Sequence, residues 1–363
     1  MIASFSRYDD FLELKDVWNE LLQSSEESDN VFLRHEWFDS WWQAFGAGRE
    51  LLVLLAYSEG QLIGAAPLML YRDRYKGVPY RRLGFIEDPN APSMNFIVRK
   101  GGEERACALF TSHLLNDLGR LWHAAILNKL PVNGKTCRSL TGHLGKNRVR
   151  FMCRESMRSP YIRTDSDWDA FLKSTDVKFR KQLRNKKNKL SKAGKVTIEE
   201  HTTHSPAVLE EVFSVSAKSW KHREGTSMVS TPERRRFFER LSSVASREGW
   251  LSIWLLRLDG RPIALEYHLK HQGRTHGMRG DFDEAYREVS PGSVLEAHII
   301  EHCFTHELKE YDFCGLDYRY KTKWTDLVHP TVNLLVYNEN FRSLSIYAMQ
   351  KYLPLVKGII EKK

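Results

Sequence analysis

Hydrophobic positions follow two different spacings along the chain, and each spacing predicts one type of element. Apolar residues three or four positions apart predict helices over 8–23, 35–45, 103–118, 134–145, 167–173, 177–192, 207–221, 232–247, 292–308 and 341–360. Short apolar runs between turn residues predict strands over 51–57, 62–71, 82–86, 95–98, 121–127, 148–153, 196–200, 250–258, 262–270, 274–280, 310–313 and 331–336. Helices and strands are mixed throughout, which indicates an α+β fold.

The order of predicted elements repeats in the two halves of the chain. Each half gives two helices, a hairpin, a strand, a helix and a further strand, and the hairpin turns are Glu59-Gly60 and Asp259-Gly260. A duplicated domain is the most economical explanation, so we expect two similar α+β units, each with its own mixed central sheet flanked by helices. Ser159-Pro160 marks the expected boundary, which divides the chain into 1–159 and 160–330, with a tail strand and helix over 331–363.

The composition is that of a globular protein with about two domains. The 363 residues are 42% hydrophobic and 28% charged, which excludes collagen, coiled coils and bulk disorder. The apolar runs stay well below the roughly 20 residues of a membrane span. The N-terminus has neither the basic region nor the apolar region of a secretion signal. The five cysteines are scattered without a Cys-x-x-Cys pair, so we expect free thiols and a cytoplasmic location.

The net charge of +9 comes from one segment. Ten Lys and Arg residues and one acid lie between Lys173 and Lys195, so the remaining chain holds 45 basic and 45 acidic residues. Such a concentration favours a polyanionic partner, for example nucleic acid, anionic lipid head groups or the phosphates of a coenzyme. A solvated helix face is the alternative interpretation.

Several motifs of other enzyme classes are missing. Gly134-Lys135-Thr136 resembles the end of a P-loop, but position 129 is Lys where that loop requires Gly. The sequence contains neither the dinucleotide-binding G-x-G-x-x-G after a strand nor the G-x-S-x-G of serine hydrolases. His298, His302 and His306 share one helix face, which is more typical of a polar surface than of a zinc site, and we expect no metal.

Two segments of the second half carry candidate chemistry. Ser290, Pro291, Gly292 and Ser293 open a helix, where free backbone N–H groups can hold a phosphate; a plain capped helix is the alternative. Further on, Tyr, Lys and Trp follow a short strand that ends in Gly315. There Tyr320 can protonate a leaving group, and Lys321 can stabilise an oxyanion, with Trp324 close by. An aromatic surface loop is the alternative here.

Six short sequence motifs resemble those of a known family. They occur in the family's order and span about 290 residues. The chain resembles the acetyltransferase-like proteins of cellulose and exopolysaccharide biosynthesis, a branch of the GNAT superfamily of N-acetyltransferases, and more distantly the Fem-type aminoacyl transferases of peptidoglycan. The motifs are Glu36-Trp37-Phe38 with Trp41-Trp42 and Phe45; Gly64-Ala65-Ala66-Pro67-Leu68; Phe179-Arg180-Lys181-x-Leu183-Arg184; Ser219-Trp220-Lys221; Tyr286 with Ser290-Pro291-Gly292; and Asp312-Phe313-x-Gly315 with Tyr320-Lys321-x-x-Trp324.

This resemblance implies a tandem pair of acetyltransferase-type domains, with the better-formed active site in the second. It also implies that the strand at 331–336 or the last helix crosses back toward the first domain. The superfamily's phosphate loop, Arg/Gln-x-x-Gly-x-Gly/Ala, is absent, and only Ser290-Pro291-Gly292 stands at the corresponding place. The donor therefore stays open between acetyl-CoA, a longer acyl-CoA, an acyl carrier protein and an aminoacyl-tRNA.

We therefore expect an acyltransferase that moves an acyl group from a thioester to an amine or hydroxyl, in exopolysaccharide or cell-envelope biosynthesis. The candidate bases are Glu266, His268 and Asp281, and Tyr320 is the candidate acid for the leaving thiolate. Candidate substrate contacts are Arg180, Arg184, Trp220, Lys321 and Trp324. The alternatives are a Fem-like transferase that uses aminoacyl-tRNA and a catalytically degenerate protein that binds an envelope-assembly partner.

Overall fold

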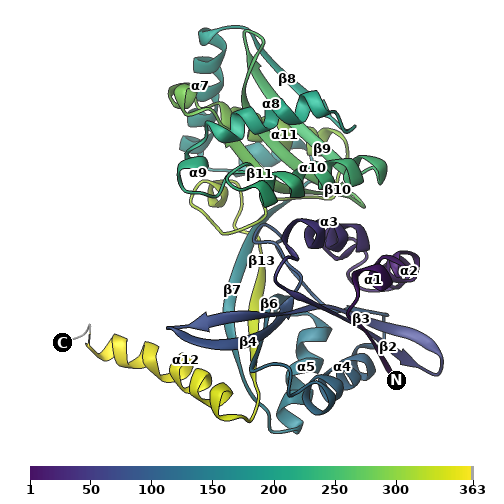
Figure 1. The fold of residues 1–363 in the computed structure, drawn as a ribbon. Coiled ribbons are helices and arrows are strands. Elements are labelled where there is room, and N and C mark those ends of the chain that lie inside the picture. Colours follow the sequence, from purple (N-terminus) through teal and green to yellow (C-terminus); the bar gives the residue numbers. More distant parts are fainter. Residues whose placement is uncertain (361–363) are drawn as a thin grey trace.

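The computed structural model describes residues 1–360, and it has two lobes joined by long strands (Figure 1). The helices are α1 (Tyr8–Leu12), α2 (Lys15–Gln23), α3 (His35–Phe45), α4 (Glu103–Ser112), α5 (Lys135–Lys146), α6 (Trp168–Ser174), α7 (Val177–Ala193), α8 (Pro206–Ala217), α9 (Trp220–Arg223), α10 (Pro232–Arg247), α11 (Pro291–Thr305) and α12 (Phe341–Ile360). None of the described helices is long and apolar enough to span a membrane.

The strands are β1 (Ile2–Phe5), β2 (Glu50–Ser58), β3 (Gln61–Tyr75), β4 (Val78–Phe85), β5 (Ile97–Val98), β6 (Ala124–Pro131), β7 (Arg150–Arg163), β8 (Val196–His201), β9 (Leu251–Leu258), β10 (Arg261–His271), β11 (Arg274–Phe282), β12 (Glu310–Asp312) and β13 (Val328–Tyr337). Short helical turns complete the list: η1 (Val31–Leu33), η2 (His113–Asp117), η3 (Glu284–Val289) and η4 (Lys321–Lys323).

Both halves have the same strand order. It is β1-β2-β3-β4-β6 in the first half and β8-β9-β10-β11-β12 in the second. Neighbouring strands are antiparallel except for the last pair of each half, β4 with β6 and β11 with β12, which are parallel. A helix, α4 or α11, makes the crossover that a parallel pair requires. The predicted α+β class, with mixed sheets flanked by helices, is confirmed.

The two sheets are joined, which differs from the expectation of separate sheets. β13 inserts between β6 and β7 and is antiparallel to both, while the end of β7 pairs with β12 through residues 161–163. Strand β7 therefore belongs to both lobes, and hydrogen bonding runs from β1 to β8 in one path. Ser159-Pro160 lies inside β7 rather than in a linker. The tail strand returns to the first half, next to β6.

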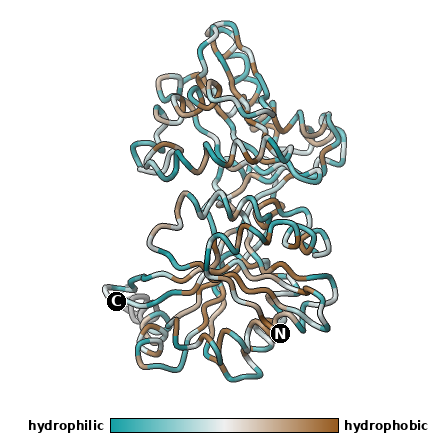
Figure 2. The backbone as a smooth tube through the Cα atoms, turned by 45° about the vertical axis from the view of Figure 1, so that its right-hand side comes forward, coloured by the Kyte–Doolittle hydropathy of each residue, from teal (hydrophilic) through white to brown (hydrophobic). Residues whose placement is uncertain are grey.

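The hydrophobic core also crosses between the lobes. Brown segments gather along the strands in Figure 2, and the largest buried cluster contains Trp37 of α3 and Phe237 of α10. Their ring centroids lie 5.3 Å apart in an edge-to-face arrangement, which is a favourable geometry for aromatic pairs. Arg240 of α10 and Asp39 of α3 add an ion pair at 2.7 Å. The lobes thus pack on each other beside the shared strands.

In the second half, helices cover both faces of the sheet. Leu265 and Tyr267 of β10 belong to the same core as α8 and α10, whereas Ala264 belongs to a second core with Leu295 of α11. This alternation follows from the two-residue period of a strand. It places every second residue of β10 toward α11, and this face carries the candidate chemistry.

One boundary that differs from the prediction matters for the site. The helix predicted over 207–221 ends at Ala217, and a separate turn, α9, begins at Trp220. Ser219 between them has an extended backbone (φ −76°, ψ 158°), and its hydroxyl donates to the Ser216 carbonyl at 2.8 Å. This local bond competes with helix continuation and redirects Lys221 toward the sheet.

Candidate active site

The carboxyl group of Glu266 lies in the second half, on the face of β10 that α11 covers. Glu266 pairs with Gly280 of β11, and a Cβ atom at residue 280 would lie 2.7 Å from the Glu266 Cδ atom. The carboxyl therefore occupies space that only a glycine leaves open. The Glu266 side chain is 12% exposed.

A second carboxyl group, that of Glu296, reaches the same region from α11. The indole Nε1 of Trp324 donates a hydrogen bond to Glu296 Oε2 at 3.1 Å. Burial raises the pKa of both carboxyl groups to about 8, and the neighbouring Glu266 charge adds to the rise at Glu296. Either group can therefore bind or release a proton near neutral pH.

Two lysines bring positive charge to Glu266. Their ammonium groups, on Lys221 of α9 and Lys321 of η4, partly offset the rise in the Glu266 pKa. Lys321 is 5% exposed and donates to the carbonyl groups of Phe313 (3.2 Å) and Cys314. Burial lowers the pKa of Lys321. An ammonium group has three donors, so the two carbonyl bonds leave one available to a ligand.

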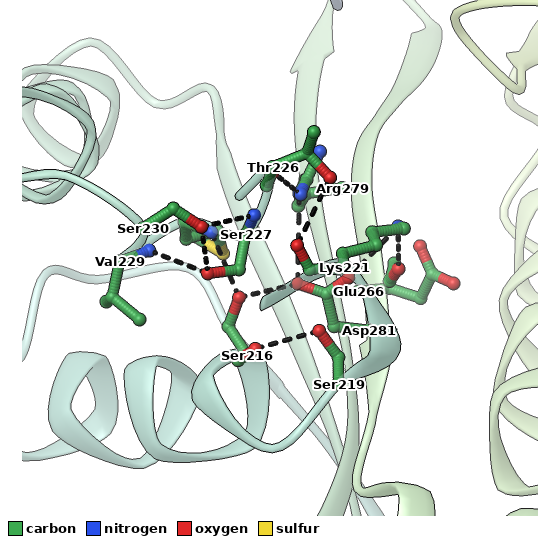
Figure 3. A network of polar contacts seen from close by, with 12 residues as sticks. Ser216, Ser219, Lys221, Thr226, Ser227, Val229, Ser230, Glu266, Arg279 and Asp281 are labelled. Carbon is green, nitrogen blue, oxygen red and sulfur yellow. Dashed lines mark hydrogen bonds and ion pairs between the residues drawn. The ribbon is translucent and has the colours of Figure 1, made fainter. Parts of the chain in front are cut away.

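Asp281 is held in a buried ion pair that faces α8 (Figure 3). Its carboxylate accepts from Ser216 Oγ at 2.6 Å and lies 3.0 Å from Lys221 Nζ and 3.7 Å from Arg279 Nε. Asp281 pairs with Leu265, whereas Glu266 pairs with Gly280, so the two acids project from opposite faces of the sheet. The network fixes the position of Lys221, which also donates to the Gly280 carbonyl.

His268 and Tyr320 border the Glu266 carboxyl in different ways. His268 is fully buried, with Nε2 3.4 Å from Glu266 Oε2, and burial lowers the pKa of His268 to about 3. The imidazole is therefore neutral at physiological pH. The Tyr320 residue as a whole is 52% exposed. Burial of its hydroxyl group raises the pKa of Tyr320, and the negative charges of Glu296 and Glu266 raise it further.

The edge of β11 is open beside this cluster. β11 pairs with β12 only through residues 274–276, and within the described chain no strand pairs with residues 277–282 on that side. Unpaired backbone groups at a sheet edge can bind an extended, amide-containing ligand. Trp220, 37% exposed, begins the turn that reaches this edge through Lys221.

The start of α11 has the features of an anion site. Its first turn contains no acidic residue, and Ser293 Oγ lies 2.9 Å from the ammonium group of Lys186 on α7. Ser290 caps the helix in a left-handed conformation (φ 52°), and Pro291 occupies the first turn. A Cβ atom at Gly292 would contact only Phe282, at 3.4 Å. A positive charge and free N–H groups thus meet at one helix end.

The two predicted arginines lie elsewhere. The Arg180 guanidinium donates to the carbonyl groups of Leu172 (3.2 Å), Lys173 (2.6 Å) and Thr175, so it stabilises the C-terminal end of α6. Arg184 lines a groove of about 590 Å³ between α7 and α11. The structure therefore brings together Glu266, His268, Tyr320, Lys321 and Trp324, whereas Arg180 is bonded to the end of α6 and Arg184 lines the groove.

The first half lacks an equivalent cluster. The two hairpins have the same register, since Leu54 pairs with Ala66 and Trp254 pairs with Glu266. Alanine therefore stands where the second half has the carboxyl. In addition, α4 begins with Glu103 and Glu104, which oppose an anion at that helix end.

The sequence predictions omitted Glu296, Arg279 and Ser216. Glu296 stands between Leu295 and Ala297 in the first half of α11, four residues after Gly292, and an acid next to a fully buried leucine is a usable signal. Arg279 and Ser216 have no such signal because they contact Asp281 only through the tertiary fold.

Comparisons with known proteins relate the second half to one domain family and the whole chain to several solved structures. Residues 177–322 match the model of the acetyltransferase (GNAT) domain. No curated protein sequence matches the chain. Among solved structures, FemX is 12% identical, with a TM-score of 0.61 over 96% of this chain and 99% of FemX.

Two further solved structures have similar folds. The C-terminal domain of the putative lysylphosphatidylglycerol synthetase from Agrobacterium fabrum is 12% identical, with a TM-score of 0.54 over 93% of this chain and 97% of that domain. L-PGS from Bacillus licheniformis is 13% identical, with a TM-score of 0.54 over 96% of this chain and 97% of that chain. The chain thus contains a region, residues 177–322, that matches the acetyltransferase (GNAT) domain, within a whole-chain fold similar to that of FemX.

Proposed function

We propose that the second half transfers an acyl group from a thioester donor, acyl-CoA or an acyl carrier protein, to an amine or hydroxyl acceptor. The observation that carries this proposal is the Glu266 carboxyl, only 12% exposed, which lies 3.4 Å from the buried His268 ring and within the field of the buried Lys321 ammonium group. Burial raises the pKa of this carboxyl to about 8. A base tuned near neutral pH and a preorganised cation are what acyl transfer requires. The match of residues 177–322 to an acetyltransferase domain supports the same reaction class.

Glu266 acts in this proposal as the general base. The acceptor nitrogen or oxygen attacks the thioester carbonyl carbon, and the Glu266 carboxylate takes the proton that the acceptor loses. Glu296 holds a second exchangeable proton at the same site, and the Trp324 indole orients the Glu296 carboxyl group. His268 is neutral and buried, so it accepts or donates a hydrogen bond at Glu266 without carrying charge.

Lys321 and Tyr320 serve the later part of the reaction. The third N–H of Lys321 stabilises the oxyanion of the tetrahedral intermediate, and the two carbonyl bonds hold the ammonium group in place. When the carbon–sulfur bond breaks, the Tyr320 hydroxyl protonates the thiolate. Asp281 is a positioning residue in this scheme, because it fixes Lys221 rather than facing the substrate.

The donor would extend from the α11 start to the open edge of β11. Ser290–Ser293 and Lys186 would hold its phosphates, and the edge over residues 277–282 would pair with the amides of the pantetheine arm. Trp220 would contact the substrate at this edge. Arg184 would contact an acceptor phosphate from the groove between α7 and α11.

The acceptor is proposed as a saccharide or amine of exopolysaccharide or cell-envelope biosynthesis. Support comes from the fold similarity to FemX and from the six family motifs in the sequence. The second candidate is transfer from aminoacyl-tRNA, which the basic residues of α7 favour. A catalytically degenerate binding protein is the third, and it predicts no turnover with any donor.

The test is an acyl-transfer assay by mass spectrometry, with a panel of acyl-CoA donors, acyl carrier protein and aminoacyl-tRNA. We expect turnover with a thioester donor and a loss of about 10²- to 10⁴-fold in Glu266→Gln. Glu288→Gln is the matched control, since this carboxyl lies before α11 and is 88% exposed. Equal turnover in both variants, or turnover only with aminoacyl-tRNA, would overturn the proposal.

A further inference from the structure

A buried histidine lies where the two lobes meet. His276 of β11 is 3% exposed, and neither ring nitrogen has a hydrogen-bond partner among the described residues. Its ring packs edge-to-face on Phe32 of the first half, with centroids 5.1 Å apart. A buried polar side chain normally has a partner, because leaving it without one costs free energy. An occupant of this place that binds imidazole would remove that cost.

Two further donor side chains converge on the same point. His276 pairs with Asp312 across the parallel strands β11 and β12, and Cys314 follows two residues later. Ligand atoms of these three side chains all lie within 4.8 Å of one another, and all three residues are buried. One nitrogen, one carboxylate oxygen and one sulfur at such spacing form a donor set typical of zinc.

The Asp312 carboxylate is already oriented. Its Oδ1 atom accepts from Ser159 Oγ at 2.6 Å and from the Cys314 backbone N–H at 2.8 Å, and neither bond uses Oδ2. Metal-ligating carboxylates are commonly fixed by such outer hydrogen bonds. A pocket of about 320 Å³ that residues of both lobes line reaches His276 and Asp312. This pocket gives an ion and its water ligand a route to His276 and Asp312.

We propose that His276, Asp312 and Cys314 bind a divalent cation of the zinc type, with a fourth position open to the pocket. The adjacent group of Glu310, Asp312 and His329 is the weaker candidate, because His329 Nε2 is already hydrogen-bonded to Glu310 Oε1 at 3.0 Å. The site departs from the sequence-based expectation of no metal. No side chain assigned to acyl transfer is among its ligands, and the two sites touch where the Cys314 backbone carbonyl accepts from Lys321.

The test is metal binding by the full chain carrying Cys153→Ser, which removes the exposed thiol. The protein is stripped with a chelator and titrated with Co²⁺ and then Zn²⁺. We expect one equivalent per chain and a near-ultraviolet thiolate-to-cobalt charge-transfer band that Zn²⁺ displaces. Cys314→Ser removes this band and weakens Zn²⁺ binding by about tenfold or more, and His276→Gln also weakens it.

Cys303→Ser is the matched control, since Cys303 is a buried free thiol of the same half that belongs to neither group of ligands. It should keep both the band and the stoichiometry. Absence of the thiolate band in the parent protein would overturn the proposal without any variant, and so would an unchanged band in a folded Cys314→Ser protein. Circular dichroism of the metal-free variants shows which of them are folded.

Discussion

The carboxyl group of Glu266 occupies the place that a side chain at Gly280 would need. A Cβ atom at residue 280 would lie 2.7 Å from Glu266 Cδ, a distance that the β10–β11 pairing cannot relieve without moving the carboxyl. The geometry of the candidate base thus depends on a glycine in the neighbouring strand.

Gly280→Ala should therefore displace Glu266 and reduce acyl transfer while leaving the fold intact. We expect a stability loss of about 1–3 kcal/mol, as for overpacked cores, and a fall in kcat larger than the change in KM. Gly142→Ala on α5 is the control, because nothing lies within 4 Å of its added methyl group. Urea unfolding and steady-state kinetics measure the two effects. Unchanged kcat in folded Gly280→Ala would show that Glu266 is not placed for catalysis.

The pH dependence of turnover should report the Glu266 carboxyl. Since its pKa is raised to about 8 and the base must be ionised, kcat/KM should rise with pH up to this region. Glu266→Gln should lose this rising limb, and Glu288→Gln should keep it. A profile that is flat from pH 6 to 9 in the parent protein would contradict the assignment.

The same carboxyl should make stability depend on pH in the opposite sense. The folded protein holds the Glu266 proton more tightly than the unfolded chain, whose glutamate pKa is about 4.3. Between pH values near 4.5 and 8 the folded state therefore binds more protons, so its contribution to stability is complete at low pH and is lost as the pH rises. Relative to Glu266→Gln, the parent protein should lose stability across this window, as thermal unfolding at several pH values would show.

Much of the fold could be predicted from the sequence because local patterns set it. The spacing of apolar residues over 35–45 and 232–247 gave both helices with the bounds that the structure has. The joined sheet could not be predicted this way. It depends on β13 entering between β6 and β7, a pairing between segments roughly 170 to 210 residues apart that leaves no local signal.

The candidate site was likewise predictable only in part. Glu266 is recognisable in the sequence as an acid within a predicted strand, and Lys321 as part of the segment that follows Gly315. The fold brings the two residues together. Arg180 also stands out, as part of a basic run, but three backbone carbonyls at the end of α6 take up its guanidinium. A charge count cannot show that a cation is already satisfied, because its partners come from the backbone of the preceding helix.

Removal of the Lys321 ammonium group should affect both stability and catalysis. In Lys321→Met the carbonyl groups of Phe313 and Cys314 lose their donor in a buried place, which should cost about 1–3 kcal/mol. Loss of the oxyanion contact should reduce kcat by about 10²- to 10³-fold. Lys323→Met, at an exposed neighbouring position, is the control. A Lys321→Met enzyme with parental kcat would remove Lys321 from the mechanism.

Lys186, and not Arg180, should be the cation that holds the donor phosphates. Lys186 lies beside the α11 start through its contact with Ser293, whereas Arg180 is bonded to the end of α6. Lys186→Ala should therefore weaken CoA binding by about tenfold, the loss of one charge-assisted hydrogen bond, and Gly292→Asp should weaken it further by placing a negative charge at the helix end. Arg180→Ala should lower the melting temperature with little effect on CoA affinity.

The salt dependence of binding then separates a coenzyme from tRNA. A coenzyme meets only a few protein charges, so its affinity should fall gently between low and physiological salt, whereas tRNA contacts many phosphates and its affinity should fall by orders of magnitude. We expect the gentle dependence, measured by titration calorimetry with CoA, and no measurable preference for tRNA over a random RNA of equal length. If the double variant Arg180→Ala/Arg184→Ala binds CoA and acceptor as the parent protein does, the exposed face of α7 is a solvated surface, and Lys186 is the one residue of that helix assigned to the donor.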